Sequence, residues 1–243
     1  MPDVSCWICG DKGNSREHLI KKSDLEGLFG KPKTRDPLFL HDANRKNYKV
    51  QGLNSDALKL KSPLCAKCNN ERSQPYDRAW EAYSHFLRNR NPPIYVGTRV
   101  PADRIFSQNA KEEMRRVQLY FVKLFGCLIQ DALIPIDLKS FSEALLTGKF
   151  HKDIFLKIGC APRQEQAVGV AGLATATDNR SGQVVGAHWF YDLGRVTVLV
   201  IYSPIHGLWE ATSTAWHPMH RKSRLWIEDF SSMLKTQAVT AEG

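Results

Sequence analysis

The chain has 243 residues, of which 42% are hydrophobic and 24% are charged, a balance typical of a water-soluble globular protein. At about 150 residues per domain, this length predicts one or two domains. Eleven Phe, seven Tyr and six Trp exclude disorder over most of the chain, because they supply ample surface to bury. The apolar stretches 117–129 and 196–202 are too short, or interrupted by Lys123, for the roughly 20 residues of a membrane span. Since the N-terminus also lacks a secretory signal, we expect a cytoplasmic protein with no membrane partner.

Basic residues outnumber acidic ones by 34 to 25, so the net charge is +9. Residues 1–90 carry 17 of the basic and 11 of the acidic side chains, which is +6 of that excess. An excess of this size is typical of proteins with a polyanionic partner, nucleic acid first. A solvated basic face is the alternative, and the charge alone does not decide between the two. The basic side chains that could track a phosphate backbone are Lys12, Arg16, Lys21, Lys22, Lys31, Lys33 and Arg35.

Four of the six cysteines form two C-x-x-C pairs, Cys6 with Cys9 and Cys65 with Cys68. A reducing cytosol disfavours disulfides. A redox C-x-x-C motif is the alternative, but it belongs at the end of a strand that leads into a helix, and neither pair has that position. Four thiolates at this spacing are typical of a tetrahedral structural zinc site. The 55 residues between the pairs exceed the usual roughly 15–20, which indicates an insertion between the two halves of the site.

Helical periodicity predicts helices over 76–90 and 110–133, and a shorter one around 138–146. In the first of these, Trp80, Tyr83 and Leu87 form an apolar stripe that we expect in the core. The diproline at 92–93 ends this helix and predicts a boundary between an N-terminal module, 1–91, and a C-terminal region, 92–243. A short helix is also expected over 24–29, within the insertion.

From residue 155 onward the pattern changes to runs of Val, Thr and aromatic residues separated by polar turns. Strands expected over 167–177, 184–191, 195–202 and 207–212 predict an antiparallel meander. The single cysteines Cys127 and Cys160 lie in apolar segments and are expected to be buried thiols, whereas His217 and His220 are expected at the surface. The predicted fold class is α+β, with a zinc-containing module followed by helices and a small antiparallel sheet.

An acidic residue and a histidine, Glu17 and His18, follow the first cysteine pair, and Asn69 directly follows Cys68. Carboxylate and carboxamide oxygens are ligands that hard divalent cations prefer. A neutral imidazole can take a proton from an attacking water while the cation stabilises developing charge. The set therefore predicts single-metal phosphodiester hydrolysis. Asn70 is an alternative to Asn69, or a helix N-cap; we favour Asn69 because it adjoins the cysteine.

Taken together, C-x-x-C, Glu-His-Leu-Ile and C-x-x-C-Asn-Asn resemble the HNH endonucleases of the His-Me finger superfamily, most closely their zinc-stapled branch. The resemblance covers roughly the first 90 residues and implies a ββα-metal module. It implies that His18 is the general base and that Glu17 and Asn69 hold a catalytic divalent ion, Mg²⁺ or another. It also implies that the four paired cysteines hold a structural zinc.

The sequence departs from the family pattern at three places. No Asn stands about five residues before Cys65, and Asn54 is the nearest one upstream; Lys21 replaces a common Pro. The segment 23–61 is longer than a minimal hairpin, and its basic stretch 45–49, with Tyr48, could contact substrate.

The resemblance implies a metal-dependent endonuclease that cleaves DNA, with RNA left open, in a setting such as restriction, anti-phage defence or mobile elements. Residues 92–243 would then serve target recognition, a protein partner or self-association. Two alternatives remain. One is a non-catalytic zinc module that binds nucleic acid or protein, and the other is an inactive core whose C-terminal region carries the function.

Overall fold

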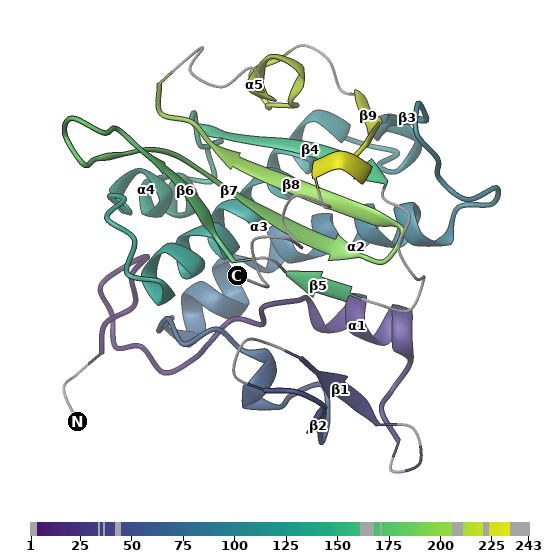
Figure 1. The fold of residues 1–243 in the computed structure, drawn as a ribbon, viewed down its shortest axis with the longest axis horizontal. Coiled ribbons are helices and arrows are strands. Elements are labelled where there is room, and N and C mark those ends of the chain that lie inside the picture. The colour runs from purple at the N-terminus through teal and green to yellow at the C-terminus, as the bar shows by residue number, and fades with distance from the viewer. Residues whose placement is uncertain are drawn as a thin grey trace.

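The computed structural model describes residues 4–33, 35, 37–41, 45–160, 168–170, 172–205, 211–220 and 224–233, and it has a mixed α+β architecture (Figure 1). The helices are α1 (Lys22–Phe29), α2 (Gln74–Asn89), α3 (Ala110–Asp131), α4 (Lys139–Thr147) and α5 (Ala211–Thr214). Shorter turns are the 3-10 segments η1 (Asp56–Leu58) and η3 (Ala102–Arg104) and a π-helical turn, η2 (Lys67–Arg72). The helices predicted over 24–29, 76–90, 110–133 and 138–146 are confirmed.

Two sheets complete the described fold. A small antiparallel pair joins β1 (Leu38–Leu40) to β2 (Tyr48–Val50). A larger, seven-stranded sheet has the order β3-β9-β4-β8-β7-β5, and β6 also pairs with β7. Its strands are β3 (Arg99–Pro101), β4 (Ile154–Cys160), β5 (Val168–Val170), β6 (Ala174–Thr177), β7 (Val184–Leu193), β8 (Val196–Tyr202) and β9 (Arg224–Asp229).

The large sheet contains the predicted meander, because β7 pairs antiparallel with β5, β6 and β8, and β8 pairs antiparallel with β4. The small antiparallel sheet predicted near the C-terminus is part of a larger, mixed sheet. β9 returns after a long connection and lies parallel to β4. β3, which precedes α3 in the chain, pairs antiparallel with β9 and forms the edge of the sheet. Local alternation of residues identifies a strand but not the direction or number of its neighbours.

Alternate residues of the central strands face two different layers. Ile154, Leu156 and Ile158 of β4 join the main core with α3, whereas Phe155 joins a smaller cluster on the opposite face. In Figure 1, α2 and α3 lie behind the sheet, and α5 lies above β4 at the top of the view. Helix α3 is therefore enclosed between the sheet and α2, which explains why its residues from 117 to 127 are buried on every side.

Aromatic rings join α2 to α3. Trp80 stacks on Tyr120 with ring centroids 5.4 Å apart and meets Phe121 edge-on at 4.7 Å. Trp80, Tyr83 and Leu87 are buried, as predicted. The same core cluster includes residues of the cysteine pairs, of α2 and α3 and of the large sheet, so it extends across the boundary expected near residue 92.

Two C-terminal expectations need correction. The strand expected over 207–212 lies outside the described residues from 207 to 210, and residues 211 and 212 belong to α5. His217, expected at the surface, is buried: its Nε2 lies 2.9 Å from the His151 carbonyl oxygen, and its ring packs on Phe150 and Phe155. His220 is exposed, as expected. Cys127 is buried, as predicted, and Cys160 is half-buried.

Candidate functional site

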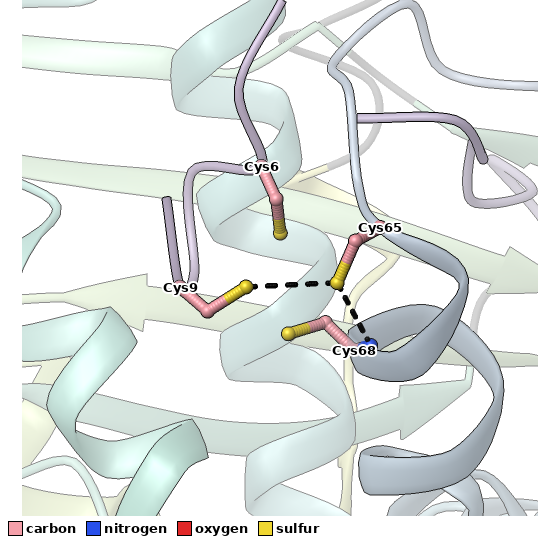
Figure 2. Close-up of side chains that lie close together, drawn as sticks. All are labelled: Cys6, Cys9, Cys65 and Cys68. Atoms are coloured by element: carbon pink, nitrogen blue, oxygen red, sulfur yellow. Dashed lines mark hydrogen bonds between the residues drawn. The ribbon is translucent and has the colours of Figure 1, made fainter. Parts of the chain in front are cut away.

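The four paired cysteines meet in one cluster, although 55 residues separate the two pairs (Figure 2). Their sulfur atoms all lie within 4.8 Å of one another, and the Cys9 and Cys65 sulfurs are 3.5 Å apart. None of the four forms a disulfide. A tetrahedron of sulfurs at about 2.3 Å from zinc has edges of about 3.8 Å, so this donor set fits a zinc ion. Four soft thiolates without oxygen ligands select zinc over magnesium or calcium.

Local hydrogen bonds shape both halves of the sulfur cluster. In the first pair, the Cys6 N–H donates to the Asp11 carbonyl oxygen at 2.7 Å, and the tight turn needs Gly10, whose φ is +81°. In the second pair, the Cys68 N–H donates to the Cys65 sulfur at 3.3 Å, and Arg72 Nη1 donates to the Cys68 sulfur at 2.8 Å. These donors offset the negative charge that four thiolates bring to a zinc ion.

Two extended segments precede the helix that carries Asn69. The first, Ser15 to His18, pairs antiparallel with the second, Lys59 to Leu64, through bridges at Ser15–Leu64 and His18–Lys59. The second segment continues directly into Cys65 and the π-helical turn η2. The chain therefore forms two paired antiparallel segments followed by a helix. The insertion, residues 19–58, connects the first segment to the second.

His18 stands at the end of the first extended segment. Its Nε2 lies 2.9 Å from the Leu53 carbonyl oxygen, which can only accept a hydrogen bond, so Nε2 carries the proton. Burial of the ring lowers the pKa of His18 below its ordinary value, although the Leu53 carbonyl and the Glu17 carboxylate favour the charged form. The ring is therefore neutral at pH 7, and its Nδ1 keeps a free lone pair, which is the state a general base requires.

Asn69 lies in the π-helical turn, beside the sulfur cluster. Its Nδ2 donates to Ser15 Oγ at 2.8 Å and to the Arg16 carbonyl oxygen at 3.3 Å, which ties the helix to the first extended segment. These donations orient the amide, so its Oδ1 is the remaining polar atom. That oxygen is buried and accepts no hydrogen bond within the described part of the chain. A buried acceptor without a donor is destabilising unless a cation or water satisfies it.

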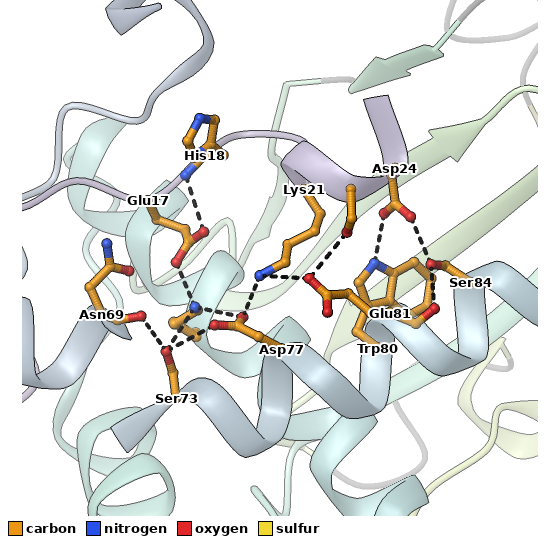
Figure 3. Close-up of polar contacts among 12 residues, drawn as sticks. Glu17, His18, Lys21, Asp24, Asn69, Ser73, Asp77, Trp80, Glu81 and Ser84 are labelled. Carbon is orange, nitrogen blue, oxygen red and sulfur yellow. Dashed lines mark hydrogen bonds and ion pairs between the residues drawn. The ribbon is translucent and has the colours of Figure 1, made fainter. Parts of the chain in front are cut away.

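Glu17 is buried, and each of its two carboxylate oxygens has a polar partner (Figure 3). Its Oε1 accepts a hydrogen bond from the His18 backbone N–H at 3.1 Å. Its Oε2 lies 2.5 Å from the Nζ of Lys123, a fully buried residue of α3. Lys123 also contacts Asp77 at 2.9 Å and Ser73 at 3.0 Å. Burial alone would lower the pKa of Lys123, but the carboxylates of Glu17 and Asp77 together raise it above its ordinary value, so the ammonium stays charged.

The three candidate residues line one open cavity of about 480 Å³. His18, Glu17 and Asn69 lie on its wall, and Asn54, the nearest upstream candidate for the family's central Asn, lies there too. Charged residues of both signs surround them. The bases are Arg16, Lys21, Lys22 and Lys59, and the acids are Glu17, Glu26, Asp77 and Glu81.

Sequence analysis missed two residues that contact the cavity-lining side chains of His18 and Glu17. Leu53 acts through its backbone carbonyl, which no side-chain pattern reveals. Lys123 did leave a signal, since it interrupts an apolar helix that is otherwise buried all around; a lone charge in such a place requires a buried partner. Asp77 of α2, which lines the cavity, lies against Lys123.

The insertion places a hairpin next to the cavity. β1 and β2 pack through Val50 on Leu53 and on Leu25 of α1, so the hairpin shares a core with the loop that contacts His18. Phe39 is 50% exposed and Tyr48 is 45% exposed. The guanidinium of Arg45 lies 5.3 Å from the centre of the Tyr48 ring. Aromatic and basic side chains are therefore exposed together on this hairpin.

Comparisons of the chain with family models, with curated proteins and with solved structures give no match. Within the described ranges, no helix combines the length and the hydrophobicity needed to span a bilayer.

Proposed function

We propose that this protein is a metal-dependent HNH-type endonuclease that hydrolyses phosphodiester bonds of DNA. The observation that carries the proposal is the pairing, in one cavity, of a neutral histidine with a buried amide oxygen that lacks a donor. The order of two antiparallel segments and a cysteine-flanked helix supports a ββα-metal module.

In this proposal His18 is the general base. The Leu53 carbonyl holds its Nε2–H, so Nδ1 accepts the proton of the attacking water. Because the ring is neutral at pH 7, this proton transfer needs no prior deprotonation of the protein. Zinc at the four cysteines would hold Asn69 and the first extended segment at a constant separation.

Asn69 Oδ1 and the Glu17 carboxylate would hold the catalytic divalent cation. Both are oxygen donors, which Mg²⁺ and Mn²⁺ prefer. The bound cation would supply electrostatic stabilisation of charge on the leaving oxygen. Glu17 has lone pairs beyond those used by Lys123 and the His18 N–H, since an ionised carboxylate offers about four acceptor positions.

Basic side chains around the cavity suit a phosphate backbone. Lys22 Nζ donates to Asn54 Oδ1 at 3.0 Å at the rim, and Lys59 lies opposite His18 in the paired segments. The exposed aromatic and basic residues of the β1–β2 hairpin extend this surface, because rings stack on bases and cations contact phosphates. DNA is the proposed substrate, and RNA is the competing outcome.

The direct test is nicking of supercoiled plasmid DNA with Mg²⁺, Mn²⁺ or Ni²⁺. We expect cleavage by the wild type and a loss of about 10²- to 10⁴-fold in His18→Ala, the usual contribution of a general base. His85→Ala, an exposed histidine on α2, is the matched control and should cleave normally. Equal cleavage by wild type and His18→Ala would refute the assignment of the base.

DNA binding by a well-folded protein, without cleavage under any of the three cations, would favour the non-catalytic zinc module instead. Cleavage of an RNA of the same sequence, but not of DNA, would change the proposed substrate and leave the site unchanged.

A further inference from the structure

Lys123 lies where three oxygen atoms surround a single positive charge. Glu17 Oε2, Asp77 Oδ1 and Ser73 Oγ are 2.5, 2.9 and 3.0 Å from its Nζ. An ammonium has three N–H donors, so all of them are used. This set of two carboxylates and a hydroxyl is chemically the same donor set that a hard divalent ion takes.

The ammonium links the segment that carries Glu17 to the turn that carries Asn69. Glu17 comes from the first extended segment and accepts from the His18 N–H. Ser73 follows the π-helical turn, and its hydroxyl donates to the Asn69 carbonyl oxygen at 2.6 Å. Lys123 itself has no exposed surface and cannot touch substrate, so any effect on chemistry passes through these neighbours.

We propose that Lys123 is a positioning residue and that its ammonium is a resident cation of the site. The ammonium holds Glu17 and the turn bearing Asn69 in register. It also keeps divalent ions out of the space between Glu17 and Asp77. The role in catalysis rests on the proposed function, whereas the exclusion of divalent ions does not. The charge comes from α3, within the region 92–243, so that region completes the centre.

A lysine that only fills space would predict something different. Its removal would lower stability but leave the ion-binding properties of the protein as they are. A resident cation predicts that its removal leaves the carboxylates of Glu17 and Asp77 facing each other. Lys21 Nζ, at 3.4 Å from Asp77, contacts Asp77 alone of the two. Such a pair attracts a divalent ion into the wrong place.

The test is Mn²⁺ binding to the zinc-loaded full chain, measured by electron paramagnetic resonance for the wild type and Lys123→Met. We expect Lys123→Met to bind Mn²⁺ at least about tenfold more tightly, or to bind one additional ion. Adding Asp77→Asn to Lys123→Met should remove this gain. The matched control is Lys157→Met, which removes another buried lysine, paired with Glu228 at 2.8 Å on the large sheet, and should bind Mn²⁺ like the wild type.

Unchanged Mn²⁺ binding in folded Lys123→Met would overturn the proposal. If that variant does not fold, Lys123→Gln keeps a polar side chain and is measured in its place. If neither variant folds, the double variant Lys123→Gln, Asp77→Asn, which has the net charge of the wild type, should unfold cooperatively. Failure of this double variant to do so also overturns the proposal.

Nicking assays separate this inference from the proposed function. Folded Lys123→Met should lose turnover while its KM for DNA stays within about twofold, because Lys123 is buried away from substrate. If the wild type cuts no nucleic acid, the proposed nuclease function is refuted. The Mn²⁺ measurement then still decides whether Lys123 excludes divalent ions.

Discussion

The Tyr191 hydroxyl donates a hydrogen bond to the buried carboxylate of Asp24 at 2.8 Å and accepts one from the Lys21 backbone N–H at 2.9 Å. Tyr191 belongs to β7, whereas Lys21 and Asp24 lie just after His18. Asp24 also accepts from Trp80 Nε1 and Ser84 Oγ of α2 (Figure 3). The large sheet therefore holds the segment that follows the candidate base.

Tyr191→Phe removes both bonds and keeps the ring. The Lys21 N–H loses its acceptor and Asp24 loses one donor, so we expect the free energy of unfolding to fall by about 1–3 kcal/mol. Urea unfolding followed by circular dichroism measures this difference. Tyr95→Phe, whose ring is exposed, is the control, and a similar loss in both variants would contradict the role of the bond.

A fragment of residues 1–91 should not fold cooperatively. It lacks Lys123, which neutralises Glu17, and Tyr191, which holds Asp24, and it exposes the face of α2 that packs on α3. A buried Glu17 carboxylate without its cation and a bare aromatic face both disfavour the compact state. Dispersed amide signals in a nuclear magnetic resonance spectrum of the zinc-loaded fragment would show the N-terminal module to be independent.

Gly126→Ala should destabilise the junction between the cysteine cluster and α3. A Cβ at Gly126 would lie 2.4 Å from Cη2 of Trp7, which stands between the first two cysteines and donates through Nε1 to the Cys127 sulfur at 3.4 Å. Overpacking of this kind costs about 1–3 kcal/mol, measured as a lower urea midpoint. Adding Trp7→Leu should relieve much of the loss. Gly52→Ala, which meets no atom within 4 Å, should be neutral.

Zinc should bind at one ion per chain and stabilise the fold. Cys68→Ser removes a ligand at the start of the turn that carries Asn69, so we expect loss of bound zinc and a clear fall in thermal stability. Mass spectrometry of the metal content tests the first point and calorimetry the second. Cys160→Ser, outside the cluster, should retain a full zinc content; zinc retained equally by both variants would exclude the four-cysteine site.

Stability should fall in mild acid because of His151. Burial, with lesser contributions from His217 and Lys152, lowers the pKa of His151 to about 4. Below about pH 6.5 the unfolded chain binds a proton at this residue that the folded chain does not, so stability is full above pH 6.5 and is lost as pH falls toward 4. Urea unfolding at pH 7, 6 and 5 should show a steeper decline for wild type than for His151→Gln. Parallel declines in the two proteins would contradict the role of His151 in the loss of stability.

Much of the fold and the candidate site followed from local sequence. The helices around Trp80 and Phe121 were predicted because apolar residues recurring at helical spacing form one buried face. The cysteine cluster was predicted because paired thiolates at this spacing can close around a single ion. Cys68 and Asn69 are neighbours in the chain, so the position of the cysteine cluster also fixes the position of Asn69.

Only the tertiary structure decided which distant groups contact the candidate residues and how the sheet is ordered. Lys123 reaches Glu17, the Leu53 carbonyl holds the His18 ring, and β9 lies parallel to β4. Periodicity reports which face of an element is buried, but it does not report what lies against that face. A buried ammonium and a backbone carbonyl find their partners through the packing of α3 and of the insertion, so residues far apart in the chain become neighbours only when the whole core forms.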